Sequence, residues 1–246
     1  MRHVFATMGT VVSLDLAEPP VGLLPRIEGI FAEADARFSL HRPDSELSRI
    51  NAGDVSLLDA SPELAEAYAL AAEWRSRTDG CFTPSRPDGL LDLNGVVKAI
   101  AMRDAGAVLE SSGFEDWTLV VGGDVFASGA GQGRAPWSTG IVDPADRTAL
   151  LCAIELRDPR RAIATSGSAE RGDHIWSSTG PSEFLQVTVV ADDILTADVL
   201  ATAIVAGGDR MLRAACEGWS VDVLAVEHAG GLSVTPGFRS ALAAAS

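Results

Sequence analysis

Apolar residues recur every three or four positions in several stretches of the chain, a spacing that predicts amphipathic helices. The clearest stretch follows Asn94, and its apolar stripe consists of Val97, Ile100, Ala101, Ala105, Val108 and Leu109. Gly113 is placed to end this helix, because glycine readily adopts the left-handed conformation that closes many helices. Ser61-Pro62 starts another, and Asp44 or Ser45 is placed to cap a short one. Helices are therefore predicted over about 24–37, 61–79, 94–111, 196–204, 209–216 and 238–246, with a short one after residue 45.

Shorter runs that alternate or are rich in β-branched residues predict strands. They cover about 4–16, with an interruption at Met8-Gly9-Thr10, and 117–121, 125–128, 139–142, 150–156, 162–165, 185–190 and 220–227. Gly122-Gly123-Asp124 separates two of these runs and predicts a hairpin. Because strands and helices mix with few regular βαβ units, we expect an α+β fold. It should have largely antiparallel sheets flanked by helices, in a single compact domain over residues 1–246.

The composition and net charge of the chain limit the classes of partner that it is expected to bind. The chain has 246 residues, of which 47% are hydrophobic, enough for a sizeable core. Its formal charge of −15 disfavours nucleic acid and anionic lipid, which bind clustered lysine and arginine. No apolar run predicts membrane insertion, and residues 1–16 lack the apolar centre of a signal peptide. With three widely separated cysteines, these features lead us to expect a cytoplasmic protein.

The start of the helix at Asn94 carries the first candidate chemistry. Asp92 to Gly95 precede or open the helix, where unpaired N–H groups and the helix dipole favour an anion. Lys98 follows one turn later. Together with the Gly122-Gly123-Asp124 turn, this cationic helix start would suit a ligand that bears phosphate. Either feature alone is common in proteins that bind no phosphate.

Asp198 and Thr202 lie four residues apart and therefore share one face of their predicted helix. Carboxylate and hydroxyl oxygens are ligands that Mg²⁺ accepts, usually with substrate phosphates completing its shell. Spacing alone favours a structural role, in which Asp198 stabilises the first turn and Thr202 bonds the backbone. The role of His174 is also left open by the sequence, since this residue could be a general base or an ordinary loop histidine. The chain has no zinc-ligand spacing, P-loop or Gly-x-Ser-x-Gly motif.

Taken in order, eight short segments of the chain resemble the FAD:protein FMN transferases, the ApbE-like flavin transferases. They span nearly the whole sequence, which makes a chance match improbable. The segments are Met8-Gly9-Thr10, Phe38 to Asn51, Gly80 to Pro84, Asp92 to Lys98, Gly122 to Asp124, Gly140 to Pro144, Ala164 to Gly167 with His174-Ile175, and Ala197 to Ala203.

This resemblance implies an ApbE-like fold and a Mg²⁺-dependent enzyme that uses FAD as its substrate. Such an enzyme moves FMN onto a Thr or Ser hydroxyl of an acceptor flavoprotein through a phosphoester and releases AMP. By analogy, the carbonyl of Gly95 with Asp198 and Thr202 would hold the metal ion. His174 would be the base for the incoming hydroxyl, and it joins Asp198 and Lys98 as a candidate catalytic residue.

The resemblance also implies an FAD site, which is lined by Met8, Ser39, His41, Glu46, Asp92, Lys98, Gly122, Gly123, Asp124, Ser166 and Gly167. His41 stands where the family usually has a tyrosine, and only Ser85 to Leu91 replace a longer family segment. A partner chain, such as the second copy of a homodimer, is one way to supply the missing wall. Two alternatives remain open at this point: an FAD pyrophosphatase that uses water as the acceptor, and an FAD-binding protein without catalysis.

Overall fold

The computed structural model describes residues 1–131, 134–167 and 182–243. Within these ranges, ten strands form an eight-stranded sheet in the order β1-β2-β3-β4-β7-β8-β9-β10 and a separate β5-β6 pair. Every neighbouring pair is antiparallel, so the α+β prediction with largely antiparallel sheet is confirmed. The strands are β1 (Arg2–Thr7), β2 (Thr10–Leu16), β3 (Trp117–Val121), β4 (Asp124–Ser128), β5 (Trp137–Val142), β6 (Leu150–Leu156), β7 (Ala162–Gly167), β8 (Phe184–Ala191), β9 (Asp222–Glu227) and β10 (Leu232–Val234).

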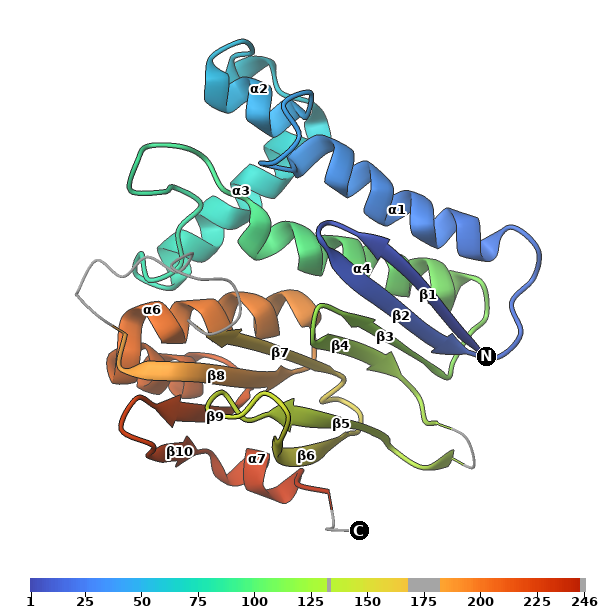
Figure 1. The fold of residues 1–246 in the computed structure, drawn as a ribbon, viewed down its shortest axis with the longest axis vertical. Coiled ribbons are helices and arrows are strands. Elements are labelled where there is room, and N and C mark those ends of the chain that lie inside the picture. Colours follow the sequence, from blue (N-terminus) through green and yellow to red (C-terminus); the bar gives the residue numbers. More distant parts are fainter. Residues whose placement is uncertain (132–133, 168–181, 244–246) are drawn as a thin grey trace.

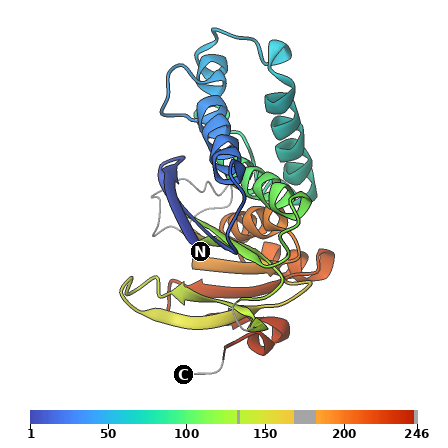
Figure 2. The ribbon, with the colours of Figure 1, turned by 90° about the vertical axis from the view of Figure 1, so that its right-hand side faces the viewer.

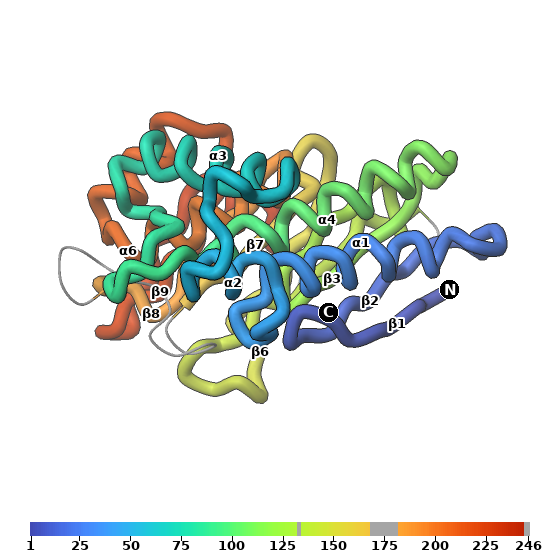
Figure 3. The backbone as a smooth tube through the Cα atoms, turned by 90° about the horizontal axis from the view of Figure 1, so that it is seen from above, coloured from blue at the N-terminus to red at the C-terminus, as the bar shows by residue number. Residues whose placement is uncertain are grey.

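Helices cover one face of the large sheet, and the β5-β6 pair with a short helix covers part of the other (Figure 1, Figure 2). Seen from above, α1 and α4 run side by side over β2 and β3 (Figure 3). The helices are α1 (Leu23–Phe38), α2 (Glu46–Ala52), α3 (Pro62–Arg77), α4 (Asn94–Ser111), α6 (Ile194–Gly218) and α7 (Pro236–Ser240), with a 3-10 turn at Leu57–Asp59. None of the helices in the described ranges is long and apolar enough to cross a membrane.

Alternation along the strands divides the apolar residues between two cores. On the helix-facing side, Leu14, Leu119 and Phe126 lie opposite one another across β2, β3 and β4 and are buried. On the other side, Val125 and Ile163 pair across β4 and β7 and join the smaller core beneath the β5-β6 pair. The period of two therefore decides which strand residues can face α4 and α6.

Helix ends follow local chemistry, as the sequence predicted. The hydroxyl of Ser45 accepts a hydrogen bond from the Ser48 amide, and the hydroxyl of Ser61 accepts one from the Leu64 amide. Gly113 has a φ of 85°, which is the left-handed conformation expected after α4. These three predictions depended only on neighbouring residues and are confirmed.

Two predictions at the C-terminal end need correction. The predicted helices at 196–204 and 209–216 form one element, α6, which is interrupted at Gly208 with a φ of 62°. A short helix is present where one was predicted over 238–246, but its bounds were wrong. It is α7, which begins at Pro236, where the Thr235 hydroxyl caps it through the Phe238 amide, and ends at Ser240. The three-residue strand β10 was not predicted at all.

Candidate active site

Several segments that the sequence marked as ligand-binding meet at one end of the sheet. The β1-β2 turn at Met8-Gly9 and the β3-β4 turn at Gly122-Gly123 lie side by side, because the Gly122 amide donates to the Val11 carbonyl at 3.3 Å. Both turns have two consecutive residues with positive φ, as tight hairpins require. The end of β7 reaches the same edge, where the Thr165 amide donates to Asp124 at 3.1 Å.

Asp124 brings a carboxylate into the layer between sheet and helices. It is the first residue of β4 and lies two positions before Phe126, so its side chain points toward the helices. Only 1% of its surface is exposed. A buried carboxylate requires charged or hydrogen-bonding partners, because the interior solvates it poorly. One oxygen accepts the Thr165 amide, and the other faces Lys98.

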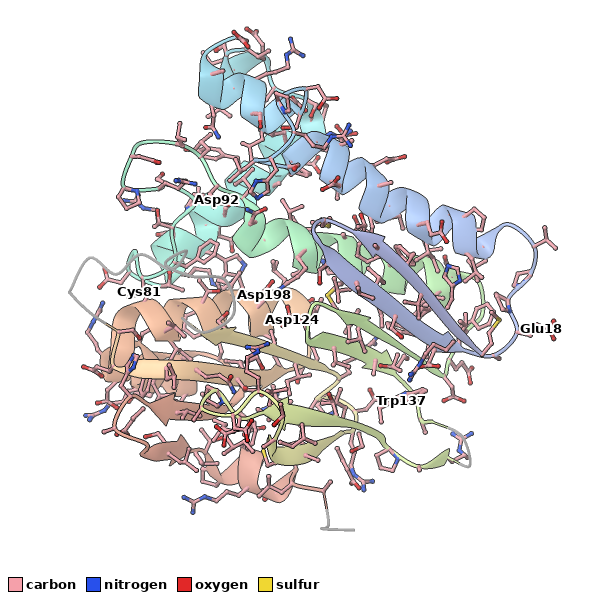
Figure 4. All side chains as sticks on the ribbon, in the orientation of Figure 1. Glu18, Cys81, Asp92, Asp124, Trp137 and Asp198 are labelled. Atoms are coloured by element: carbon pink, nitrogen blue, oxygen red, sulfur yellow. The ribbon has the colours of Figure 1, made fainter. Side chains whose placement is uncertain are left out.

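Lys98, on the second turn of α4, forms ion pairs with two carboxylates. Its ammonium contacts Asp124 and lies 3.5 Å from the Oδ2 atom of Asp198 on α6. Asp198 is 4% exposed, and Figure 4 shows it next to Asp124 between α6 and the strands. The sequence predicts only that Asp198 shares a helix face with Thr202, whereas α6 is buried on most sides because α4 and the sheet both pack against it.

Thr202 and Gly95 complete the predicted metal set. The hydroxyl of Thr202 forms a 3.0 Å hydrogen bond with that of Ser166, which projects from the end of β7 toward α6. Gly95, in the first turn of α4, packs under the ring of Phe82, and a Cβ atom there would lie 2.7 Å from that ring. Glycine therefore lets the ring approach the helix start closely. Gly95 lies three residues before Lys98, so the two share one side of α4.

The donor set fits a hard divalent cation. Asp198 supplies a carboxylate and Thr202 a hydroxyl, and the neighbouring Asp124 adds negative charge. No group of three or more His, Cys, Asp or Glu side chains that could hold a metal ion occurs in the described ranges. The carboxylate and hydroxyl oxygens of Asp198 and Thr202 suit Mg²⁺, which is commonly bound by one or two carboxylates plus substrate phosphates.

A protein-family comparison decides the relationship. The model of the ApbE family matches residues 8–88 and 85–224, which together include every described site segment named above. The chain belongs to the ApbE family. The FAD:protein FMN transferase of Vibrio cholerae serotype O1 is 28% identical over 153 residues, which cover 57% of this chain and 45% of that protein. The matched segment thus spans less than half of this curated relative.

Solved ApbE structures share the fold. The flavin transferase ApbE from Vibrio cholerae has a TM-score of 0.80 at 24% identity and covers 98% of this chain and 99% of its own. The ApbE protein from Thermotoga maritima has a TM-score of 0.83 at 20% identity, with 98% of both chains covered. The apo form of the flavinyl transferase ApbE from Pseudomonas stutzeri has a TM-score of 0.79 at 20% identity and covers 99% of this chain and 97% of its own. At these identities the comparison supports the fold alone.

Asn51, which was not among the predicted site residues, holds the loop that leads to the ApbE site. Its amide donates to the Leu91 carbonyl at 2.9 Å and accepts from the Leu91 amide at 2.8 Å. The same loop is closed by a bridge between Ser85 and Leu91, and Asp92 then accepts the Asn94 amide at 2.9 Å. Asn51 thus fixes the short segment that precedes α4. Its place in the family-like segment from Phe38 to Asn51 was the one signal for it in the sequence.

Replacing Asn51 with alanine should loosen this loop. The Leu91 amide and carbonyl would both lose their partners, so we expect the free energy of unfolding to fall by about 1–3 kcal/mol. Urea unfolding measures the loss, and thermolysin cleavage next to Leu90 should become faster. Asn94→Ala, at an exposed asparagine at the start of α4, is the matched control. Equal midpoints for the two variants would contradict the role of Asn51.

The predicted ligand loop from Ser39 to Glu46 lies above the β1-β2 turn in the two side views (Figure 1, Figure 2). The Ser39 carbonyl accepts from the hydroxyls of Ser45 at 2.6 Å and Ser48 at 3.0 Å. Glu46 accepts from the amide and hydroxyl of Ser61 at 2.5 and 2.6 Å, so it supports the start of α3. These contacts give Glu46 a structural role, and its part in binding FAD stays a prediction.

Three further predicted residues differ in how far the structure describes them. His41 is exposed at the surface of this loop, and Gly167 pairs with Gln186 at the end of β7. His174 lies outside the described residues, so its role as base stays a prediction.

Cys81 precedes Phe82 near the site, but its chemistry argues against a nucleophile. Its sulfur lies 3.3 Å from the Arg210 guanidinium and packs closely against Gly207. Burial raises the pKa of the Cys81 thiol, and the opposing effect of Arg210 is smaller. The thiol therefore stays protonated at neutral pH, and the thiolate is the reactive form.

Proposed function

We propose that this protein is a Mg²⁺-dependent FAD:protein FMN transferase, which moves FMN from FAD to a Thr or Ser hydroxyl of an acceptor protein and releases AMP. The observation that carries the proposal is the meeting of Lys98, Asp124, Asp198, Thr202 and Ser166 at one end of the sheet in a chain of the ApbE family. The name of the curated relative supports the same activity.

The proposed reaction exchanges one bond to phosphorus for another. The acceptor hydroxyl attacks the phosphorus on the FMN side of the FAD diphosphate, and a phosphoester forms. The bond from that phosphorus to the bridging oxygen breaks, so AMP leaves with the bridging oxygen. The hydroxyl proton passes to a base, for which we propose His174. A bound magnesium ion would neutralise negative charge on the diphosphate.

The chain's own residues would bind and orient the dinucleotide. Lys98 would offer its ammonium to the diphosphate, while Asp124 holds that ammonium in place from the sheet. Asp198, Thr202 and the Gly95 carbonyl would hold the metal ion. The remaining predicted contacts from the β1-β2 turn, the Ser39–Glu46 loop, Asp92 and the end of β7 would position the rest of FAD. Positioning of this kind supplies much of the rate in phosphoryl transfer.

One assay separates transfer from its alternatives. The protein is incubated with FAD and Mg²⁺, with or without an acceptor protein, and AMP and protein-bound flavin fluorescence on a denaturing gel are measured. Transfer predicts AMP together with a fluorescent acceptor band. AMP with free FMN alone would identify a pyrophosphatase, and intact FAD that copurifies with the protein would identify a binding protein; either result would overturn the proposal.

Replacing His174 with alanine should slow transfer by about a hundredfold or more while FAD binding changes little, because a general base acts in the reaction rather than in binding. Transfer rates and the dissociation constant of FAD, measured on the same preparation, check this. His228→Ala, at a histidine beyond β9, serves as the control. If the His174 variant loses binding and transfer in equal proportion, His174 has a structural role.

We further propose that residues 1–246 act as a single domain. The larger core supports this, since it includes Val12 near one end of the chain and Ala225 near the other. A homodimer also stays a prediction, which analytical ultracentrifugation of the purified protein would test.

A further inference from the structure

Lys98 occupies an unusual electrostatic position. Its ammonium contacts Asp124 and lies 3.5 Å from Asp198, and its side chain is 13% exposed. The three groups come from α4, β4 and α6, so their meeting depends on the packed fold rather than on sequence proximity. Two largely buried carboxylates thus share one lysine, and the three side chains together carry a charge of −1.

A divalent cation bound to Asp198 would lie close to this ammonium. Two like charges only a few ångströms apart repel more strongly in a largely buried place than in water, because the effective dielectric is lower there. The repulsion with a doubly charged ion is larger. The Lys98 ammonium and the cation therefore compete for the same carboxylate.

We propose that Lys98 is an internal counterion that keeps Mg²⁺ affinity low until a diphosphate arrives. The inference rests on the proposed function for the identity of that diphosphate. Mg²⁺ alone would change the charge of the cluster from −1 to +1, which is unfavourable in a largely buried place. A diphosphate bridge with two negative charges would return it to −1. Metal and dinucleotide should therefore bind cooperatively, and each should raise the affinity of the other by the same factor.

Lys98→Gln tests this role without using catalysis. We expect the dissociation constant of Mg²⁺, measured by calorimetry without FAD, to fall by about tenfold or more, because the competing charge is gone. FAD binding in EDTA should weaken by about tenfold, because the diphosphate loses a cationic partner. These opposite changes distinguish a counterion from a structural residue, whose loss would weaken both. Mg²⁺ should also raise the Tm of the variant more than that of the wild type.

Two controls accompany the variant. Arg103→Gln removes a cation of the same helix, which pairs with Asp193 at 3.9 Å and is 44% exposed, and it should leave both affinities unchanged. Lys98→Arg retains the charge and should retain weak Mg²⁺ binding. Unchanged or weaker Mg²⁺ binding by Lys98→Gln would overturn the inference.

The wild-type protein provides a second measurement in case Lys98→Gln does not fold. Mg²⁺ is titrated with and without saturating ADP, which carries a diphosphate but no flavin. The inference predicts that Mg²⁺ binds the complex of the protein with ADP at least about tenfold more tightly than it binds either the protein alone or ADP alone. Independent binding would overturn it. Neither titration requires AMP release, so these results remain separate from success or failure of the transferase assay.

Discussion

Replacing Asp198 with alanine is expected to abolish AMP release from FAD, with a fall in rate of about a thousandfold or more. Asp198 is the carboxylate of the proposed metal set, and loss of metal-assisted charge neutralisation removes several kcal/mol of transition-state stabilisation. The variant should still fold, because the Lys98 ammonium keeps its contact with Asp124. AMP release is followed by chromatography at saturating FAD and Mg²⁺.

Asp193→Ala is the matched control for this experiment. Asp193 caps the same helix by accepting the Thr196 amide at 3.0 Å, so its loss should cost stability of about 1 kcal/mol. It lies outside the proposed metal set, and its variant should release AMP at nearly the wild-type rate. Full activity of Asp198→Ala would remove the metal assignment, and equal loss in both variants would indicate damage to α6 rather than to the site.

Replacing Asp124 with alanine should produce the largest loss of stability, about 3–5 kcal/mol, because it breaks a buried ion pair and leaves the Lys98 ammonium with one carboxylate fewer. The Thr165 amide would also lose its acceptor, which weakens the junction of β4 and β7. Chemical unfolding in guanidinium chloride, monitored by tryptophan fluorescence, measures the change.

Asp15→Ala provides the comparison at the surface. Asp15 pairs with Arg2 at 2.8 Å, but the arginine side chain is 69% exposed, so this loss should change stability little. Asp124→Asn should fall between the two, since an amide oxygen can still accept the Thr165 amide. If Asp124→Ala is no less stable than Asp15→Ala, the buried cluster does not contribute to folding as the structure indicates.

Local signals in the sequence were sufficient for most elements. Ser45, Ser61 and Gly113 mark helix ends because each acts on backbone groups within one turn of itself. The Gly122-Gly123-Asp124 break between two strand-like runs likewise placed Asp124 at a hairpin. The break at Gly208 was different: Glu183 accepts the Asp209 amide at 2.9 Å there, and this partner lies 26 residues away.

The candidate site depended more on tertiary contacts. Spacing placed Asp198 and Thr202 on one helix face, but it gave no sign that Lys98 would contact both Asp124 and Asp198. Those contacts exist because α4 and α6 pack together above the start of β4. Asn51 and Leu91 are 40 residues apart, so patterns of neighbouring residues could not predict their paired hydrogen bonds either.

The junction between β4 and β7 also bears on the order in which parts of the fold are synthesised on the ribosome. Only Val125 with Ile163 and Phe126 with Ala162 pair across it, and it joins the strands that precede and follow the β5-β6 pair. Lys98 and Asp124 leave the ribosome well before Asp198 and Thr202, since translation runs from the N-terminus. Unfinished copies would therefore lack two of the three proposed metal ligands until α6 has been synthesised.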